Sequence, residues 1–225
     1  MEDDTILDID NLPYEAYYVF SIKNSSDVLI AGGQIKGERY KHTRSGGEDG
    51  HGINIQGSHN VRLINMKISS NWGDGIYLGT QKVRQDDGSQ LPTGCTDILI
   101  NNCVIEDNRR NNISIVDADR VNIENCTILN AHGTQPEAGI CIESNDDCSD
   151  DTVCRDITIS DTTIKTGKSI TDWHYRSFFT YNNHGSYAIA RDVTIENCYF
   201  EGYYGNYNGS NVRLINTTIK GTREG

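Results

Sequence analysis

A nine-residue motif recurs seven times along the 225-residue chain, and it constrains the fold more than any other feature. Each copy has a polar residue, an alternating V/I-x-I/L run, a short polar pair and a closing apolar residue. The copies are DVLIAGGQI (27–35), NVRLINMKI (60–68), DILINNCVI (97–105), RVNIENCTI (120–128), DITISDTTI (156–164), DVTIENCYF (192–200) and NVRLINTTI (211–219). Their starts are 33, 37, 23, 36, 36 and 19 residues apart. This irregular spacing excludes simple hairpins and favours a stack of coils joined by loops of variable length.

A second motif lies between most of these copies and alternates with the period of a strand. Its copies are GINIQ (52–56), GIYLG (75–79), NISIV (112–116) and GICIE (139–143). The two motifs predict an all-β solenoid of about seven coils, in which each strand stacks in parallel on the coil before. We expect residues 1–225 to form one domain, either whole or a fragment of a longer chain. Inserted loops are expected near 80–95, 143–155 and 165–187.

Stacked coils bring equivalent positions of the motif into columns. One column holds asparagines at the bend after the first strand, where amide side chains hydrogen-bond one another and tolerate left-handed backbone. The next column is small or sulfur-containing and is expected to face inward, so its cysteines are packing residues. Cys148 and Cys154 could close a small disulfide loop, although a reduced state fits the sequence equally well.

Charge and hydropathy exclude several classes of partner. The net charge of −12 and the pI of about 4.8 disfavour nucleic acid, because phosphate binding requires a basic face. They also disfavour polyanionic glycans, unless a cation or a local Lys/Arg cluster intervenes. The apolar runs are only as long as strands, so we expect no membrane insertion. The first residues are acidic and lack the apolar region of a signal peptide.

The repeats resemble a known family. The stretch GERYKHT through GGEDGHGINIQGSHNVRLINMKISSNWGDGIYLG is similar to β-helix repeat proteins of bacteria and their phages, including tail-spike-type depolymerases. The resemblance covers roughly residues 18–220 and implies a single-stranded right-handed parallel β-helix of the pectate-lyase-like superfamily. That superfamily contains hydrolases, lyases, epimerases and non-catalytic adhesins. The resemblance implies a polysaccharide substrate or ligand, an extracellular or virion-associated location, and a possible homotrimer.

Acidic, histidine and arginine residues that could take part in catalysis lie immediately before the strands of the second motif. Aligning these strands puts His51, Asp74, Asn111 and Ala138 at one position, and neighbouring coils are about 4.8 Å apart. The best cluster consists of acid/base candidates and two guanidinium groups: Glu48, Asp49, His51, Asp74, Arg109, Arg110 and Glu137. "NWGDGIYL" also resembles a strand of polygalacturonases. Asn111 and Asn112 stand where that family has a pair of aspartates, so we transfer no catalytic residue from it.

Two reactions remain open for this cluster. A hydrolase would use two of the carboxylates of Glu48, Asp49, Asp74 and Glu137 as acid and as base or nucleophile. A lyase would use His51, an arginine or a tyrosine to remove a proton next to a uronate carboxylate. Two structural alternatives carry equal weight: Asp74 could bond the backbone of the next coil, and His51 could be a satisfied turn residue.

Aromatic residues supply the candidate sugar-binding surface, because aromatic faces suit the apolar faces of sugars. The segment 166–187 is rich in them, although it could instead pack on itself or on a second subunit. Trp72 could stack on a sugar or pack over a corner of the solenoid. We predict no resident cofactor or metal site, although ESNDDCSDD (143–151) could bind Ca²⁺. The candidate substrate-binding residues are Trp72, Tyr77, Arg109, Arg110, Glu143, Trp173, His174 and Tyr175.

The sequence therefore predicts a polysaccharide-acting β-helix. Hydrolysis of a glycan is the first hypothesis, and β-elimination by a lyase is the second. A non-catalytic glycan-binding or structural module of a tail or adhesin is the third.

Overall fold

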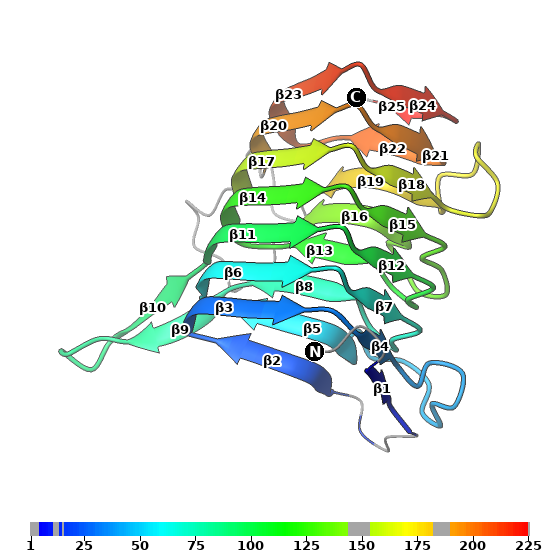
Figure 1. Ribbon diagram of the computed structural model, residues 1–225. Helices are drawn as coiled ribbons and strands as arrows, with labels where there is room; N and C mark the ends of the chain where they lie inside the picture. Colours follow the sequence, from blue (N-terminus) through cyan, green and yellow to red (C-terminus); the bar gives the residue numbers. More distant parts are fainter. Residues whose placement is uncertain (1–4, 11–13, 15, 144–153, 182–189, 225) are drawn as a thin grey trace.

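The computed structural model describes residues 5–10, 14, 16–143, 154–181 and 190–224. These residues form three long parallel sheets that wind around one axis, as Figure 1 shows, and this confirms the predicted parallel β-helix. Apart from one inserted hairpin, the chain passes through the three sheets in turn, so that each complete coil adds one strand to each sheet. Equivalent positions of the repeats therefore stack along the axis.

Sheet 1 contains the short strands that close each first motif: β1 (Ile6–Asp8), β4 (Gln34–Lys36), β7 (Lys67–Ser69), β12 (Val104–Glu106), β15 (Thr127–Leu129), β18 (Thr163–Lys165), β21 (Tyr199–Glu201) and β24 (Thr218–Lys220). Sheet 2 contains the strands that open this motif: β3 (Ser26–Ala31), β6 (His59–Ile64), β11 (Cys95–Asn101), β14 (Ala118–Glu124), β17 (Cys154–Ser160), β20 (Ala190–Glu196) and β23 (Gly209–Ile215). Sheet 3 contains the second motif: β2 (Tyr18–Lys23), β5 (His51–Gln56), β8 (Ile76–Gly79), β13 (Ile113–Ile115), β16 (Ala138–Glu143), β19 (Arg176–Tyr181), β22 (Tyr203–Asn206) and β25 (Arg223–Glu224).

The core is a set of aliphatic columns inside the coil. Ile68, Ile105 and Ile128 of sheet 1 lie in register and are fully buried. Each such side chain contributes about 1.5–3 kcal/mol through the burial of apolar surface. The alternation of the motifs thus sets the register, because a slip by one residue would turn each column toward solvent.

The bends between sheets 2 and 1 carry the predicted asparagine ladder. Asn102 Nδ2 donates to Asn65 Oδ1 at 2.8 Å, and Asn216 makes the same bond to Asn197. The backbone φ angles of these four residues lie between 46° and 57°, the left-handed region that asparagine tolerates best after glycine. The adjacent sulfur-containing column is buried as predicted, with Cys103 and Cys126 at most 2% exposed.

The glycines of the second motif are explained by close approach between coils. A Cβ atom added to Gly75 would lie 2.7 Å from the carbonyl oxygen of Asn112 in the next coil and 2.6 Å from Asn108 Nδ2. At Gly75 the neighbouring coil therefore leaves no room for a side chain.

The insertions differ from the prediction in one place. Residues 80–95 include an antiparallel hairpin of β9 (Gln81–Arg84) and β10 (Gln90–Thr93), which projects from the solenoid in Figure 1. The expectation of one long loop over 165–187 was wrong, because β19 lies inside it as a regular strand of sheet 3. Phe178 and Thr180, both buried, stand where the preceding strand has isoleucines, and this hid the repeat.

Residues 144–153 lie outside the described residues. Whether ESNDDCSDD binds Ca²⁺ and whether Cys148 and Cys154 form a disulfide therefore stay open. The described part of the chain contains no helix long and apolar enough to cross a membrane.

Candidate functional site

The outer face of sheet 3 carries the predicted cluster. Backbone hydrogen bonds run from Gly52 to Asp74, from Gly75 to Asn111, and from Asn112 to Ala138, each across one coil step. The predicted alignment of His51, Asp74, Asn111 and Ala138 is therefore correct. Four further side chains of this face also stack in register on successive strands: Asn54, Tyr77, Ser114 and Cys141.

Asp74 is fully buried, and its carboxylate is saturated by its neighbours. Oδ1 accepts the backbone N–H of Asn111 at 2.9 Å, and Oδ2 accepts the hydroxyl of Ser114 at 2.9 Å. Oδ2 also contacts Arg110 Nη1 at 3.2 Å. The residue thus joins two coils and holds an arginine in place, which is the structural role left open by the sequence.

His51 is also buried and has a defined tautomer. Its Nδ1 accepts the backbone N–H of Asp74 at 2.9 Å, so the neutral ring carries its proton on Nε2, which points toward Asp49 at 3.7 Å. The ring stacks on Tyr77, with centroids 4.9 Å apart, and on Tyr18 at 5.6 Å. Burial lowers the pKa of the imidazole and outweighs the nearby carboxylates.

Arg110 is the centre of the cluster. Its Nη2 contacts Glu143 Oε1 at 2.9 Å and Glu48 Oε2 at 3.3 Å, while Nη1 contacts Asp74. Burial alone would lower its pKa, but the carboxylates of Asp74, Glu143 and Glu48 together raise it. The guanidinium therefore stays charged and gathers three carboxylates from three different coils.

The two outer carboxylates of this cluster differ in environment. Glu143 lies at the end of β16 with its side chain 13% exposed, and burial raises its pKa despite the ion pair with Arg110. Glu48 lies in the segment before β5 with its side chain 72% exposed. A buried carboxyl of raised pKa beside an exposed carboxylate is the arrangement that separates an acid from a base.

Trp72 and Arg109 form a corner of the solenoid. The indole is stacked between the ring of His42, at 3.9 Å, and the guanidinium of Arg109, at 3.8 Å. Its Nε1 donates to the carbonyl of Gly46, and Arg109 donates to the carbonyls of Gly47 and Trp72. Both faces of the indole are therefore covered within the protein. Trp72 offers no face for sugar stacking. Arg109 holds the segment that contains Glu48 in place through its hydrogen bond to the carbonyl of Gly47.

The remaining candidate residues are dispersed. Asp49 is half exposed at the rim of the cluster. Glu137 bonds Gly133 and Gln135 of its own loop rather than Arg110. His174 pairs with Asp172 at 2.7 Å, and its ring contacts that of Trp173 in a tilted arrangement with centroids 3.9 Å apart. The backbone carbonyl of Tyr175 accepts the N–H of Tyr203.

Two residues of this face were not among the candidates predicted from the sequence. Ser114 completes the shell of Asp74, and Arg176 occupies the column position after Ala138. The column alignment could have revealed Arg176 if β19 had been recognised as a strand.

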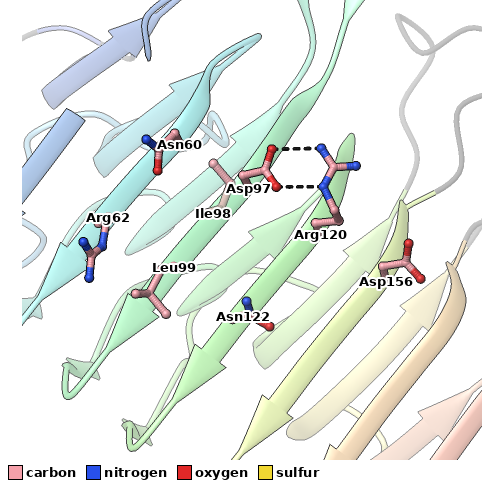
Figure 2. Close-up of a pocket in the computed structure, with 8 residues that line it drawn as sticks. All are labelled: Asn60, Arg62, Asp97, Ile98, Leu99, Arg120, Asn122 and Asp156. Carbon is pink, nitrogen blue, oxygen red and sulfur yellow. Dashed lines mark hydrogen bonds and ion pairs between the residues drawn. The ribbon is translucent and has the colours of Figure 1, made fainter. Parts of the chain in front are cut away.

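A hollow of about 490 Å³ lies on sheet 2, away from this cluster. Figure 2 shows the guanidinium of Arg120 turned toward Asp97, with which it forms contacts of 2.7 and 2.8 Å. The pair is half exposed and mutually satisfied. We therefore interpret this hollow as a solvated surface of the sheet rather than as a catalytic site. Among the described residues, no group of three or more His, Cys, Asp or Glu side chains could hold a metal ion.

Comparison with known proteins agrees with the fold. Residues 3–153 match the model of a family described as a right handed beta helix region, and the chain belongs to this family. The chain is 40% identical over 139 residues to the uncharacterized protein YclG of Bacillus subtilis (strain 168), an alignment that covers 58% of this chain and 23% of the relative. The chain spans about a quarter of the length of the curated relatives that it matches.

Solved structures show the same architecture at low sequence identity. A crystal structure of the pectate lyase Pel9A has a TM-score of 0.59 and 10% identity, covering 94% of this chain and 53% of that chain. The tailspike protein gp49 from Pseudomonas phage LKA1 has a TM-score of 0.52 and 14% identity, covering 88% of this chain and 27% of that chain. At these identities the likeness shows a shared fold.

Proposed function

We propose that this chain belongs to a polysaccharide-acting protein that hydrolyses glycosidic bonds, with Glu143 as general acid and Glu48 as nucleophile. One observation carries the proposal: both carboxylates contact the same Nη2 atom of Arg110, at 2.9 and 3.3 Å. The two contacting oxygens are therefore at most about 6 Å apart, near the separation of retaining rather than inverting glycosidases.

The assigned roles follow from burial. Glu143, with its raised pKa, keeps a proton at a higher pH than an ordinary glutamate and donates it to the leaving glycosidic oxygen. The exposed carboxylate of Glu48 attacks the anomeric carbon as the bond to that oxygen breaks. Water then cleaves the glycosyl ester, and Glu143 accepts a proton from this water. Arg110 and Asp74 position both groups.

The geometry supports a lyase less well. In the neutral tautomer of His51, the one basic lone pair lies on Nδ1, which already accepts the N–H of Asp74. A base at this position would have to break that bond before it could remove a proton from a sugar. The charge of the cluster points the same way, because its carboxylates outnumber its guanidinium groups and repel a uronate at the cleavage point.

A polysaccharide-binding module without catalysis is the second candidate. It is favoured by an aromatic pocket on the same sheet, next to the cluster. The structural neighbours include a phage tailspike protein and a pectate lyase, and these support an extracellular or virion-associated site of action. A homotrimer, as in spike proteins, is part of this proposal.

Product analysis tests the proposal. The protein is incubated with a panel of neutral and acidic polysaccharides, and new reducing ends are followed together with absorbance from unsaturated uronates. Reducing ends alone are expected. Both signals together would replace the hydrolase with a lyase, and retention of a polysaccharide without any product would favour the binding module.

A further inference from the structure

The outer face of sheet 3 has a second feature beside the carboxylate cluster. A pocket of about 280 Å³ is lined by aromatic side chains, among them Trp173, Phe179, Tyr181 and Tyr207, and by Arg176. Tyr181 lies directly opposite Glu143 on the neighbouring strand. The pocket therefore continues the surface that carries Arg110 and its carboxylates.

Arg176 is the unusual member of this pocket. It is 5% exposed, and its guanidinium lies 4.2 Å from the ring centroid of Phe179 and 5.1 Å from that of Trp173. Nη1 donates to the side-chain oxygen of Gln135 and to the carbonyl of Pro136, both of which are neutral. Nε is buried without a hydrogen-bond partner among the described residues.

The charge of Arg176 has no counterion within the described part of the chain. Arg110, which precedes β13 and so lies two strands away in the same sheet, contacts three carboxylates. Arg109 also lacks a carboxylate contact, but each of its three nitrogens donates to an oxygen acceptor. A buried charge is costly unless it is paired, and Arg176 combines an unpaired charge, a free N–H and an adjoining pocket.

No carboxylate of the described residues forms an ion pair with it, although the charge of Glu137 acts to raise its pKa. Glu137 is bonded to Gly133 and Gln135, and Glu224 accepts the hydroxyl of Tyr207 at 2.7 Å. Aromatic faces surround the guanidinium and suit the apolar face of a pyranose ring. The unpaired guanidinium and the aromatic side chains together suit a sugar that carries an anionic group.

We propose that this pocket binds a carboxylate-bearing sugar unit of the polysaccharide, with its carboxylate on Arg176 and its ring against the aromatic side chains that line the pocket. This inference rests on the proposed function and names its substrate class. A net charge of −12 opposes a polymer in which every unit is acidic. The substrate class is therefore a heteropolysaccharide whose acidic units are separated by neutral ones, with a neutral unit at the carboxylate cluster.

The test is a binding assay on immobilised acidic bacterial heteropolysaccharides, each beside a derivative whose carboxyl groups are reduced to alcohols. The Glu48→Gln variant is used as the reference, so that cleavage does not remove the ligand. It is expected to bind acidic members at least tenfold more tightly than their reduced derivatives. Equal binding of the two forms, or binding to no acidic member, would overturn the inference.

Two pocket variants and one control complete the design. Arg176→Gln should abolish the preference for the acidic form, and Trp173→Ala should weaken both forms. Trp173 is 54% exposed, so this second variant is expected to fold even if Arg176→Gln does not. Tyr40→Ala, at an exposed aromatic residue away from the pocket, should bind like the reference. An unchanged preference in a folded Arg176→Gln protein also contradicts the inference.

The two proposals fail in different ways. Selective binding without any cleavage by the unmodified protein would remove the hydrolase and leave the acidic-sugar site. Cleavage of neutral polysaccharides without retention of acidic ones would do the reverse.

Discussion

The carboxylate of Asp74 accepts the backbone N–H of Asn111, one coil further along the solenoid, at 2.9 Å. The same carboxylate bonds Ser114 and Arg110 and is fully shielded from solvent. It therefore has no free oxygen for a substrate. Its function is to join adjacent coils and to orient Arg110, which forms ion pairs with Glu48 and Glu143.

Replacement of Asp74 should consequently affect stability before it affects chemistry. Asp74→Asn removes the charge that pairs with buried Arg110 and is expected to lower the free energy of unfolding by about 3 kcal/mol. Urea denaturation measures this change. Asp97→Asn is the matched control, because its ion pair with Arg120 is exposed, and it should change little. Equal stability of the two variants would contradict the role assigned to Asp74.

His51 should make stability depend on pH. Because the folded state lowers its pKa from 6.5, the unfolded chain binds a proton more readily. The stabilisation is present above pH 6.5 and is lost as pH falls through the lower folded pKa. Thermal unfolding of the parent and of His51→Gln between about pH 4 and pH 8, a range that brackets the ordinary histidine pKa, measures this dependence. The difference between the two proteins should shrink with acidification, and a constant difference would argue against a buried neutral imidazole.

Glu143 should set the alkaline limb of the activity profile. A general acid works only while protonated, so the rate should fall as pH rises through the pKa of Glu143, which lies above the ordinary 4.5. Initial rates of reducing-end release across pH measure this limb. A limb that is unchanged in the residual activity of Glu143→Gln would assign the acid to another group.

Trp72 should control the order of the segment that carries Glu48. Trp72→Ala removes the stack between His42 and Arg109, and faster amide hydrogen exchange is expected over residues 42–50. Exchange in β11 and β14 should stay unchanged. Tyr40→Ala serves as the control for loss of an aromatic side chain, and equal exchange in both variants would contradict the corner role.

The repeats made the fold predictable, because each column of isoleucine, asparagine or cysteine depends only on the register between coils. Strand β19 escaped detection because Phe178 and Ser177 replace the usual isoleucine and glycine of its motif. A sequence pattern records which positions face inward, but it does not record substitutions that the core accommodates with a larger side chain.

The site was predictable in position and less so in roles. His51, Asp74 and Arg110 came together because they share a column or adjoin it. The roles depended on contacts that no spacing reveals: Asp74 is saturated by Asn111 and Ser114, and Trp72 is covered on both faces. Glu143 gained its raised pKa from burial, which the repeat pattern does not record.

The most direct test of the central claim compares glycan cleavage by the unmodified protein, Glu143→Gln and Glu106→Gln. Glu106 pairs with Lys67 at 2.8 Å on sheet 1 and is the matched control for loss of a paired carboxylate. On a polysaccharide that the protein cleaves, Glu143→Gln is expected to reduce the rate of reducing-end release by about 10²–10⁴-fold, while Glu106→Gln leaves it unchanged. Equal rates for all three proteins would contradict the assignment of Glu143 as the general acid.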